Sequence, residues 1–160
     1  LRARVPGFGR CRLLDGADLP GFRETRRMEG EYTLTAEDIA AGRKFPDVVA
    51  HNVNFCFDTH NPAGGGQAED LEAARDTRPY DIPYRCLLPR KVKNLLAAGR
   101  CISGTHKAHS SYRVMNICMA LGEAAGIAAA LSARKGVSPG QVDVREIQAA
   151  LAGKGIDLFG

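Results

Sequence analysis

The sequence contains no tryptophan, and aromatic residues make up 6% of its 160 residues. Proteins that bind single-stranded nucleic acid stack bases on aromatic side chains placed among basic ones, and this sequence lacks that combination. The net charge of +4 is mild and the 22 lysines and arginines are scattered, so a nucleic-acid partner is not specifically indicated. An anionic small molecule would use the same surplus of positive charge.

Paired cysteines are lacking as well. The five cysteines show no C-x-x-C spacing, which predicts reduced thiols and a cytoplasmic location rather than a disulfide framework. Two interpretations of Cys101 are open: a redox role, or the commoner role of a free cysteine as a small buried hydrophobic residue. His106-x-x-His109 has neither paired cysteines nor H-E-x-x-H spacing, so no metal is expected. The cysteines are Cys11, Cys56, Cys86, Cys101 and Cys118.

The stretch that organises the rest of the chain begins with a short apolar run. Leu95–Ala98 predicts a strand buried on both faces, as in parallel α/β sheets. Gly99 then allows a sharp turn, and a polar loop follows over Ser103–Ser111. Since a helix start attracts anions, the loop and Arg113 together indicate a site for a negative or electron-rich ligand. The plain alternative is a simple turn and a solvated arginine.

One long helix is expected over Tyr112–Arg134, with Ser110 or Ser111 as its cap. Glycine costs about 1 kcal/mol inside a helix relative to alanine, so its two glycines need a reason. We expect a bare groove on which another backbone or a flat ligand lies. Small residues at this spacing also occur in membrane helices, but Asn116 and Glu123 interrupt the apolar run and no membrane is expected. The four-residue series is Cys118, Gly122, Gly126 and Ala130.

The other expected elements rest on alternation and on helix caps. Capping boxes at Thr35 and Asp143 predict helices over Ala36–Ala41 and Val144–Ala152, and Gly136 is expected to end the long helix. Alternating or apolar runs predict strands, and the prolines make Pro79–Pro89 extended. The predicted strands are Met28–Leu34, Val48–Ala50 and Val53–Phe57.

Two stretches resemble a known family. They are RETRRMEGEYTLTAEDIAAGRKFPD and YDIPYRCLLPRKVKNLLAAGRCISGTHKAHSSYRVMNICMALGEAAGIAAAL. Together they cover about residues 22–131 and resemble FAD-dependent oxidoreductases of the glutathione-reductase-2 type, in particular bacterial flavoproteins. The resemblance implies FAD as cofactor, with the last strand of a Rossmann-like sheet ending at the AGR segment. It places Gly99 and Arg100 along the ribityl and phosphate side of the flavin.

The same resemblance implies further cofactor contacts. The next helix points its N-terminus at the flavin pyrimidine, so Arg113, Val114 and Met115 approach the ring carbonyls, and Ser103 is a further cofactor-binding position. Independently of the resemblance, Asp58-Thr59-His60 closes a predicted strand, a position where catalytic side chains often lie, so His60 is the candidate catalytic acid or base. Asp58 itself lies too close in sequence to be its obvious orienter. The alternative is a surface loop histidine.

Arg23–Arg27 is the densest charged cluster. It fits a clamp for a carboxylate substrate, because guanidinium forks pair with carboxylates. It also fits an ion-pair network on a solvated strand. A noncatalytic nucleic-acid-binding module is the alternative class of function. That module would use Arg2, Arg4, Arg10, Arg12 and Arg23–Arg27 on phosphates and bind with a strong salt dependence.

The G-x-G-x-x-G fingerprint of FAD-binding proteins is missing. The nearest match starts at Gly7 but follows Pro6 and precedes no helical pattern, while Gly64–Gly66 has no strand before it. We therefore expect the C-terminal part of a longer flavoenzyme, inactive alone. Its fold class is α/β, or α+β within the fragment: a strand-rich antiparallel substrate or cap portion over residues 1–85, the last FAD-domain strand and helix over 86–135, and a helical tail over 136–160. The expected partner is a small-molecule substrate, with an anionic one as an option, and the bare surfaces favour self-association.

Overall fold

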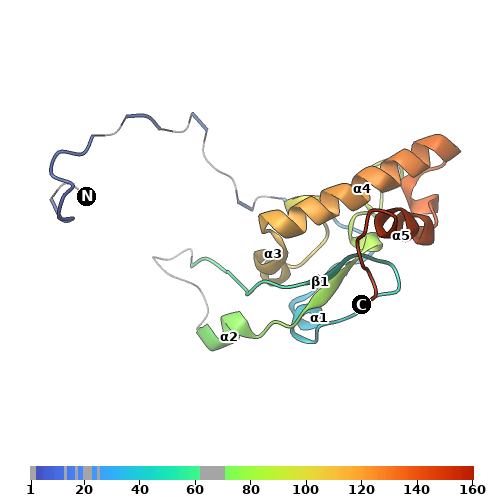
Figure 1. The fold of residues 1–160 in the computed structure, drawn as a ribbon, viewed down its shortest axis with the longest axis horizontal. Helices are drawn as coiled ribbons and strands as arrows, with labels where there is room; N and C mark the ends of the chain where they lie inside the picture. Colours follow the sequence, from blue (N-terminus) through green and yellow to red (C-terminus); the bar gives the residue numbers. More distant parts are fainter. Residues whose placement is uncertain (1–2, 13, 17, 20–22, 25, 62–70) are drawn as a thin grey trace.

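The computed structural model describes residues 3–12, 14–16, 18–19, 23–24, 26–61 and 71–160. Helices and a two-stranded antiparallel sheet make up its regular structure. The long helix α4 (Met115–Lys135) lies across the sheet, with α5 (Val144–Ala152) beside it and α1 (Ala36–Ala40) on the far side (Figure 1). The mixed content confirms the α+β fold class.

The sheet consists of β1 (Val48–Val53) and β2 (Tyr80–Pro83) within the described residues. They pair in antiparallel register, with Ala50 opposite Ile82. The prediction of separate strands before and after Ala50 is wrong in detail, because β1 runs through the gap and ends at Val53. The register is irregular on either side of Ala50, and Asn52 has a φ of 48°, a conformation that asparagine tolerates better than most residues.

The expected strand Met28–Leu34 forms isolated bridges instead. The amide of Glu31 donates to the Leu88 carbonyl at 2.9 Å, whereas the amide of Leu34 donates to Ser103 at 3.1 Å. The segment changes partner halfway along, so neither pairing extends into a ladder. It therefore ties the sheet region to the loop before α3 (His106–Tyr112).

Local signals predicted several helix ends correctly. Thr35 and Asp38 form the reciprocal capping box at the start of α1, and Gly136 ends α4 in the left-handed conformation with a φ of 65°. α5 has the bounds that the sequence predicted. The remaining elements are α2 (Leu71–Arg75) and the 3₁₀ turns η1 (Tyr84–Cys86), η2 (Gly99–Cys101) and η3 (Pro139–Gln141). The expected loop Gly64–Gly66 lies outside the described residues.

The predicted long helix corresponds to α4 but starts too early, and the predicted polar loop Ser103–Ser111 contains a separate helix, α3. α3 ends at Tyr112 and α4 begins at Met115, with Val114 extended between them. The predicted caps Ser110 and Ser111 are wrong, because both are buried inside α3. The Ser111 hydroxyl does not cap a helix but donates to the Phe55 carbonyl at 2.6 Å. The chain leaves the helical path where such long-range contacts hold the end of α3.

The predicted strand Leu95–Ala98 is wrong as well. The Ala97 amide donates to the Leu87 carbonyl at 3.0 Å, but the segment joins no sheet among the described residues. The side chain of Leu95 is 51% exposed. A central strand needs a neighbour along each edge, and here β1 and β2 pair with each other.

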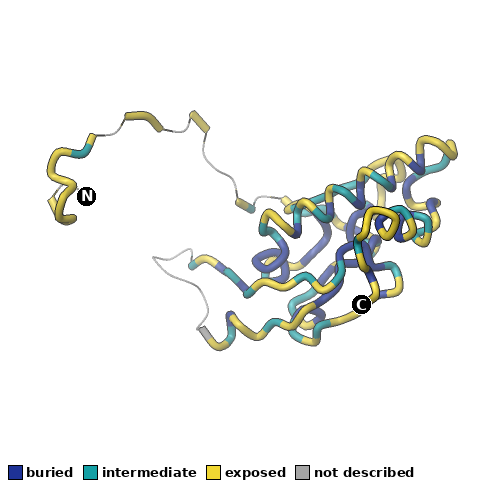
Figure 2. Tube along the Cα trace, viewed as in Figure 1, coloured by how far each residue is buried: buried dark blue, intermediate teal, exposed yellow. Residues whose placement is uncertain are grey.

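The outer face of α4 is built from small and flexible apolar residues. Met115 and Met119 are 84% and 74% exposed, and no described atom lies within 4 Å of where a Cβ would stand on Gly122 or Gly126. Figure 2 shows this exposed face along the helix. Among the described residues α4 is the helix long and apolar enough to cross a membrane. The core helix of a soluble protein passes the same test, and the opposite face of α4 packs on β1 and α5.

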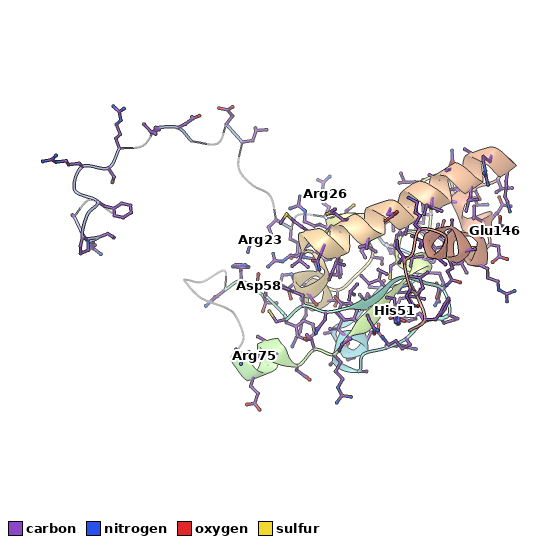
Figure 3. All side chains as sticks on the ribbon, viewed as in Figure 1. Arg23, Arg26, His51, Asp58, Arg75 and Glu146 are labelled. Atoms are coloured by element: carbon purple, nitrogen blue, oxygen red, sulfur yellow. The ribbon has the colours of Figure 1, made fainter. Side chains whose placement is uncertain are left out.

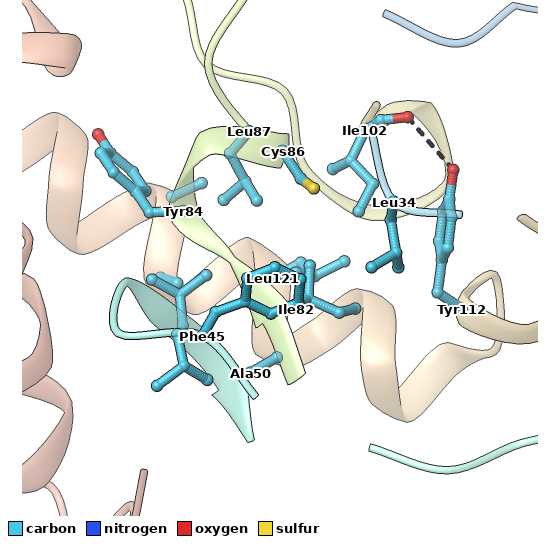
Figure 4. Packing of buried hydrophobic residues seen from close by; sticks show 14 of the residues in the cluster. Leu34, Phe45, Ala50, Ile82, Tyr84, Cys86, Leu87, Ile102, Tyr112 and Leu121 are labelled. Carbon is cyan, nitrogen blue, oxygen red and sulfur yellow. Dashed lines mark hydrogen bonds between the residues drawn. The ribbon is translucent and has the colours of Figure 1, made fainter. Parts of the chain in front are cut away.

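A single hydrophobic cluster lies between α4, the sheet and the loop before α3 (Figure 4). Leu34, Ile82 and Leu121 are fully buried in it, and burying such side chains contributes about 2 kcal/mol each. The Tyr112 hydroxyl donates to the Ile102 carbonyl at 3.2 Å across the same cluster. Burial raises the pKa of the Cys86 thiol to about 12. This core fixes the end of α3 against the loop that precedes it.

Candidate functional site

Several polar segments meet at the junction of α3 and α4. Arg113 at this junction contacts Asp58, Asp58 contacts His60, and His60 contacts Arg23. Arg100 in η2 reaches the Arg23 carbonyl at 3.5 Å. Figure 3 shows Arg23 and Asp58 at the end of the molecule where α3 meets α4. Residues far apart in the sequence therefore gather at one end of α4.

The turn at Gly99 is confirmed. Its φ of 69° lies in the left-handed region, which costs glycine little and other residues more. A Cβ built on Gly99 would lie 3.7 Å from Cys118 Sγ, so the turn packs directly on the second turn of α4. Burial raises the pKa of the Cys118 thiol, whereas Cys101 is exposed and its thiol donates to the Ala98 carbonyl at 3.2 Å.

The start of α4 has no side-chain cap from the described residues. Val114 takes the N-cap position and is half-buried, while Met115 and Asn116 are exposed. The first amide groups of a helix have no intrahelical acceptor, and the helix dipole adds partial positive charge there. An electron-rich group is the natural partner for such a helix start.

Arg113 lies at the C-terminal end of α3, not in the first turn of α4 as the sequence suggested. Its side chain is 9% exposed, and it donates to Asp58 Oδ2 at 2.8 Å and to the Asp58 carbonyl at 2.5 Å. Burial, followed by repulsion from Arg23, lowers the pKa of the guanidinium. The reading of Arg113 as a solvated surface charge is therefore wrong.

His60 lies beside the same carboxylate. Its Nε2 is 3.4 Å from Asp58 Oδ2, and its side chain is 53% exposed. The sequence interpretation that discounted Asp58 as a partner of His60 is wrong, because the backbone after β1 turns both side chains to one side. The missed signal is the Asp-x-His spacing, which places alternate side chains on one face of an extended segment.

The Arg23–Arg27 cluster divides into two parts. Glu24 and Arg27 form an ion pair, and Glu24 also approaches His106 Nδ1 at 3.0 Å and His109 Nδ1 at 3.3 Å. This part matches the ion-pair interpretation. Arg23 instead contacts His60, which makes it part of the α3–α4 junction.

The predicted cofactor-binding residues do not all share this junction. Gly99, Arg100, Arg113, Val114 and Met115 lie on η2 or at the α3–α4 junction. The sixth predicted residue, Ser103, is 1% exposed, and its hydroxyl bonds to Thr33 Oγ1 at 2.9 Å, so its side chain is directed into the interior. In the part of the chain that the structure describes, no group of three or more His, Cys, Asp or Glu side chains has the arrangement of a metal site.

A glycine turn lies against a helix start that has no side-chain cap from the described residues, and arginines flank both; such a helix start attracts electron-rich groups. A family model for FAD dependent oxidoreductases matches residues 1–151, and the chain belongs to that family. This confirms the resemblance seen in the sequence and supports flavin redox chemistry in general. Comparisons with curated proteins and with solved structures gave no match.

The residues at the junction fit a flavin. The donor set consists of helix amides and guanidinium groups, which suit carbonyl oxygens and a negative charge. When bound, FAD supplies the electron transfer, and the protein contributes position and electrostatics. The backbone turn at Gly99 lies against α4, so the two elements present one continuous surface.

Proposed function

We propose that this chain forms the flavin-ring side of an FAD-dependent oxidoreductase that acts on a small molecule. The observation that carries the proposal is the uncapped start of α4 beside the η2 turn, in a chain of this family. Amides of the first turn of α4, at Met115 and Asn116, would donate to the ring carbonyls. Val114 would contact the ring, and Gly99 and the backbone of Arg100 would line the ribityl and phosphate side.

The arginine and the carboxylate at the junction act as a pair. Because Arg113 is bonded to Asp58, its positive charge is largely balanced, and the helix start carries the stabilisation of a negative ring. His60 is half-exposed next to this pair and is the proposed acid or base. Its contacts with Asp58 and Arg23 hold the ring beside this pair, where it would exchange a proton with a bound substrate.

The 160 residues contain no G-x-G-x-x-G phosphate loop. We therefore propose that the chain alone binds FAD weakly and is inactive, and that a further dinucleotide-binding segment completes the site. The free cysteines favour a cytoplasmic location, and the exposed face of α4 favours self-association of the isolated chain.

The test uses the protein from the complete reading frame that contains this chain. Arg113→Ala leaves Asp58 unpaired beside the flavin, so flavin retention should weaken and the reduction potential should fall. Asp58→Asn removes the balancing negative charge, so the potential should rise. Potentiometric titration and a flavin-release assay measure both effects.

Arg134→Ala is the matched control, since it removes an arginine in the last turn of α4, far from the junction. Its potential should equal that of the wild type. Equal potentials in all of these variants would show that the flavin lies elsewhere. A complete reading frame without G-x-G-x-x-G after a strand would also remove the proposal.

The nucleic-acid alternative has no supporting observation. Of its arginines, Arg23 and Arg27 contact His60 and Glu24. A salt-dependent gel shift remains its direct test.

A further inference from the structure

We propose that Arg23, Arg100 and Arg113 form a site for a small oxyanion, which we assign to the carboxylate of the substrate. The site lies where η2 and the α3–α4 junction meet the segment that carries Arg23. Its use as a substrate site rests on the proposed function, whereas anion binding itself does not.

A continuous series of contacts brings these groups together. Arg100 Nη1 lies 3.5 Å from the Arg23 carbonyl, and the guanidinium of Arg23 contacts His60 Nε2. His60 Nε2 in turn lies 3.4 Å from Asp58 Oδ2, which accepts from Arg113 at 2.8 Å. The series joins three guanidinium groups to one carboxylate.

Two further guanidinium groups act on Arg113. Burial is the largest cause that lowers the pKa of its guanidinium, followed by repulsion from Arg23; its contact with Asp58 opposes this shift, and repulsion from Arg100 adds a smaller effect. The cations therefore face one another closely enough to interact. The neighbouring Glu24 is already paired with Arg27. A bound anion would relieve the repulsion, because each guanidinium offers a planar fork to carboxylate oxygens.

One side of the site is open to solvent. Arg23 and Arg100 are exposed, while Arg113 lies beneath them with 9% of its side chain accessible. The half-exposed ring of His60 borders the same groups. A small carboxylate held by the outer arginines would thus lie next to an imidazole that exchanges protons, close to the start of α4.

The oxyanion chemistry has two sources in a flavoprotein, a substrate carboxylate and the cofactor pyrophosphate. The test therefore titrates the ¹⁵N-labelled 160-residue chain with succinate, with ADP, and with sodium chloride at matched ionic strength. Arginine Nε–Hε signals and the amide signals of Met115 and Asn116 report binding. The variant is Arg23→Gln with Arg100→Gln, and the control is the exposed Arg145→Gln.

We expect succinate to shift the Arg23 and Arg100 signals in a saturable way. The double variant should weaken its affinity by about tenfold, whereas Arg145→Gln should leave it unchanged. Shifts reproduced by sodium chloride, or unaffected by the double variant, would overturn the site. Saturable shifts with ADP and none with succinate would overturn the substrate assignment.

The flavin test is independent of this one. If succinate binds but Arg113→Ala and Asp58→Asn leave the flavin potential of the complete enzyme unchanged, the proposed flavin placement fails and the anion site stands. If the potentials shift as proposed but succinate does not bind, the anion site fails alone.

Discussion

The two ends of α4 are held in different ways. At the start, Arg113 bonds to Asp58, which lies 55 residues earlier in the chain, and Tyr112 reaches Ile102 through the buried core. At the other end, Gly136 turns the chain in the left-handed conformation and Lys135 pairs with Glu146 at the surface. The start thus depends on buried contacts between distant segments. The end depends on local conformation and exposed charges.

This difference matches the chemistry of the two ends. The start leaves helix amides without a side-chain cap from the described residues, beside half-buried charges. Such an arrangement is unfavourable by itself and persists where the surrounding structure supports it. At the other end, the amides of Gly136 and Val137 donate back to carbonyls of the last turn of the helix. Substitutions at the two ends should therefore differ in size and in their response to pH and salt.

Gly104→Ala should have the largest effect. A Cβ at this position would lie 2.5 Å from Tyr112 Cε1 and 2.7 Å from its hydroxyl, so the core below the start of α4 would have to shift. We expect a loss of about 3 kcal/mol in the free energy of unfolding, measured by urea denaturation.

Gly126→Ala is its control. No described atom lies within 4 Å of the new Cβ, and replacing glycine inside a helix should add about 1 kcal/mol. Equal stability of Gly104→Ala and the wild type would show that the start of α4 is not tightly packed.

Acid should weaken the start of α4 through His109. Burial, helped by nearby cations, lowers its pKa from 6.5 to about 4. Below pH 6.5 the unfolded chain gains a proton that the folded chain refuses, so stability falls as the pH drops. Between pH 7 and pH 5 the loss should be about 2 kcal/mol. The charged groups around the ring are Arg27, Arg100, Arg113, His106 and Glu24.

Urea denaturation at both pH values measures this loss, and NMR titration measures the pKa. His109→Gln should remove most of the difference between the two pH values. His106→Gln should keep it, because the ring of His106 is 68% exposed. A His109 pKa near 6.5 would contradict the prediction.

Gly136→Ala should have a smaller effect at the other end of the helix. Alanine at a φ of 65° is strained, and no described atom lies within 4 Å of its Cβ, so the cost is conformational alone. We expect about 1 kcal/mol, independent of pH. Gly140→Ala, at a position without positive φ, should change the unfolding free energy little. A loss above that of Gly104→Ala would reverse the order of the two ends.

Lys135→Ala should have the smallest effect. Its partner Glu146 is exposed to a similar degree, and such surface pairs are worth about 0.3 kcal/mol. A double-mutant cycle with Glu146→Ala measures the coupling. The coupling should vanish at high salt, and coupling that persists there would mean that this end is held by more than surface charge.

The sequence predicted features that depend on local residues and missed those that depend on contacts between distant segments. The start of α5 at Asp143 and the end of α4 at Gly136 depend on residues within one turn, and both predictions were correct. The break at Val114 depends on Asp58 and the core, so no proline or glycine marks it. Thr105 was the available signal, since its hydroxyl caps α3 by accepting from the Ala108 amide.

In the candidate site as well, features set by local residues could be predicted and features set by distant contacts could not. Gly99 could be predicted to turn, because its conformation is a property of the residue itself. The apolar run at Leu95–Ala98 could not be distinguished from a strand, since a strand is defined by partners elsewhere in the chain. The contact of Asp58 with His60 was signalled by the Asp-x-His spacing, but its contact with Arg113 required the folded chain, because 55 residues separate the two.

The burial of Cys86 makes its labelling rate a measure of how fast the core opens. Its thiol is fully enclosed and keeps its proton at neutral pH, whereas Cys101 stands at the surface. A thiol reagent should therefore modify Cys101 at once and reach Cys86 as fast as the core opens. Labelling Cys86 in each variant would measure how fast the packed region beneath α4 opens, with no engineered cysteine.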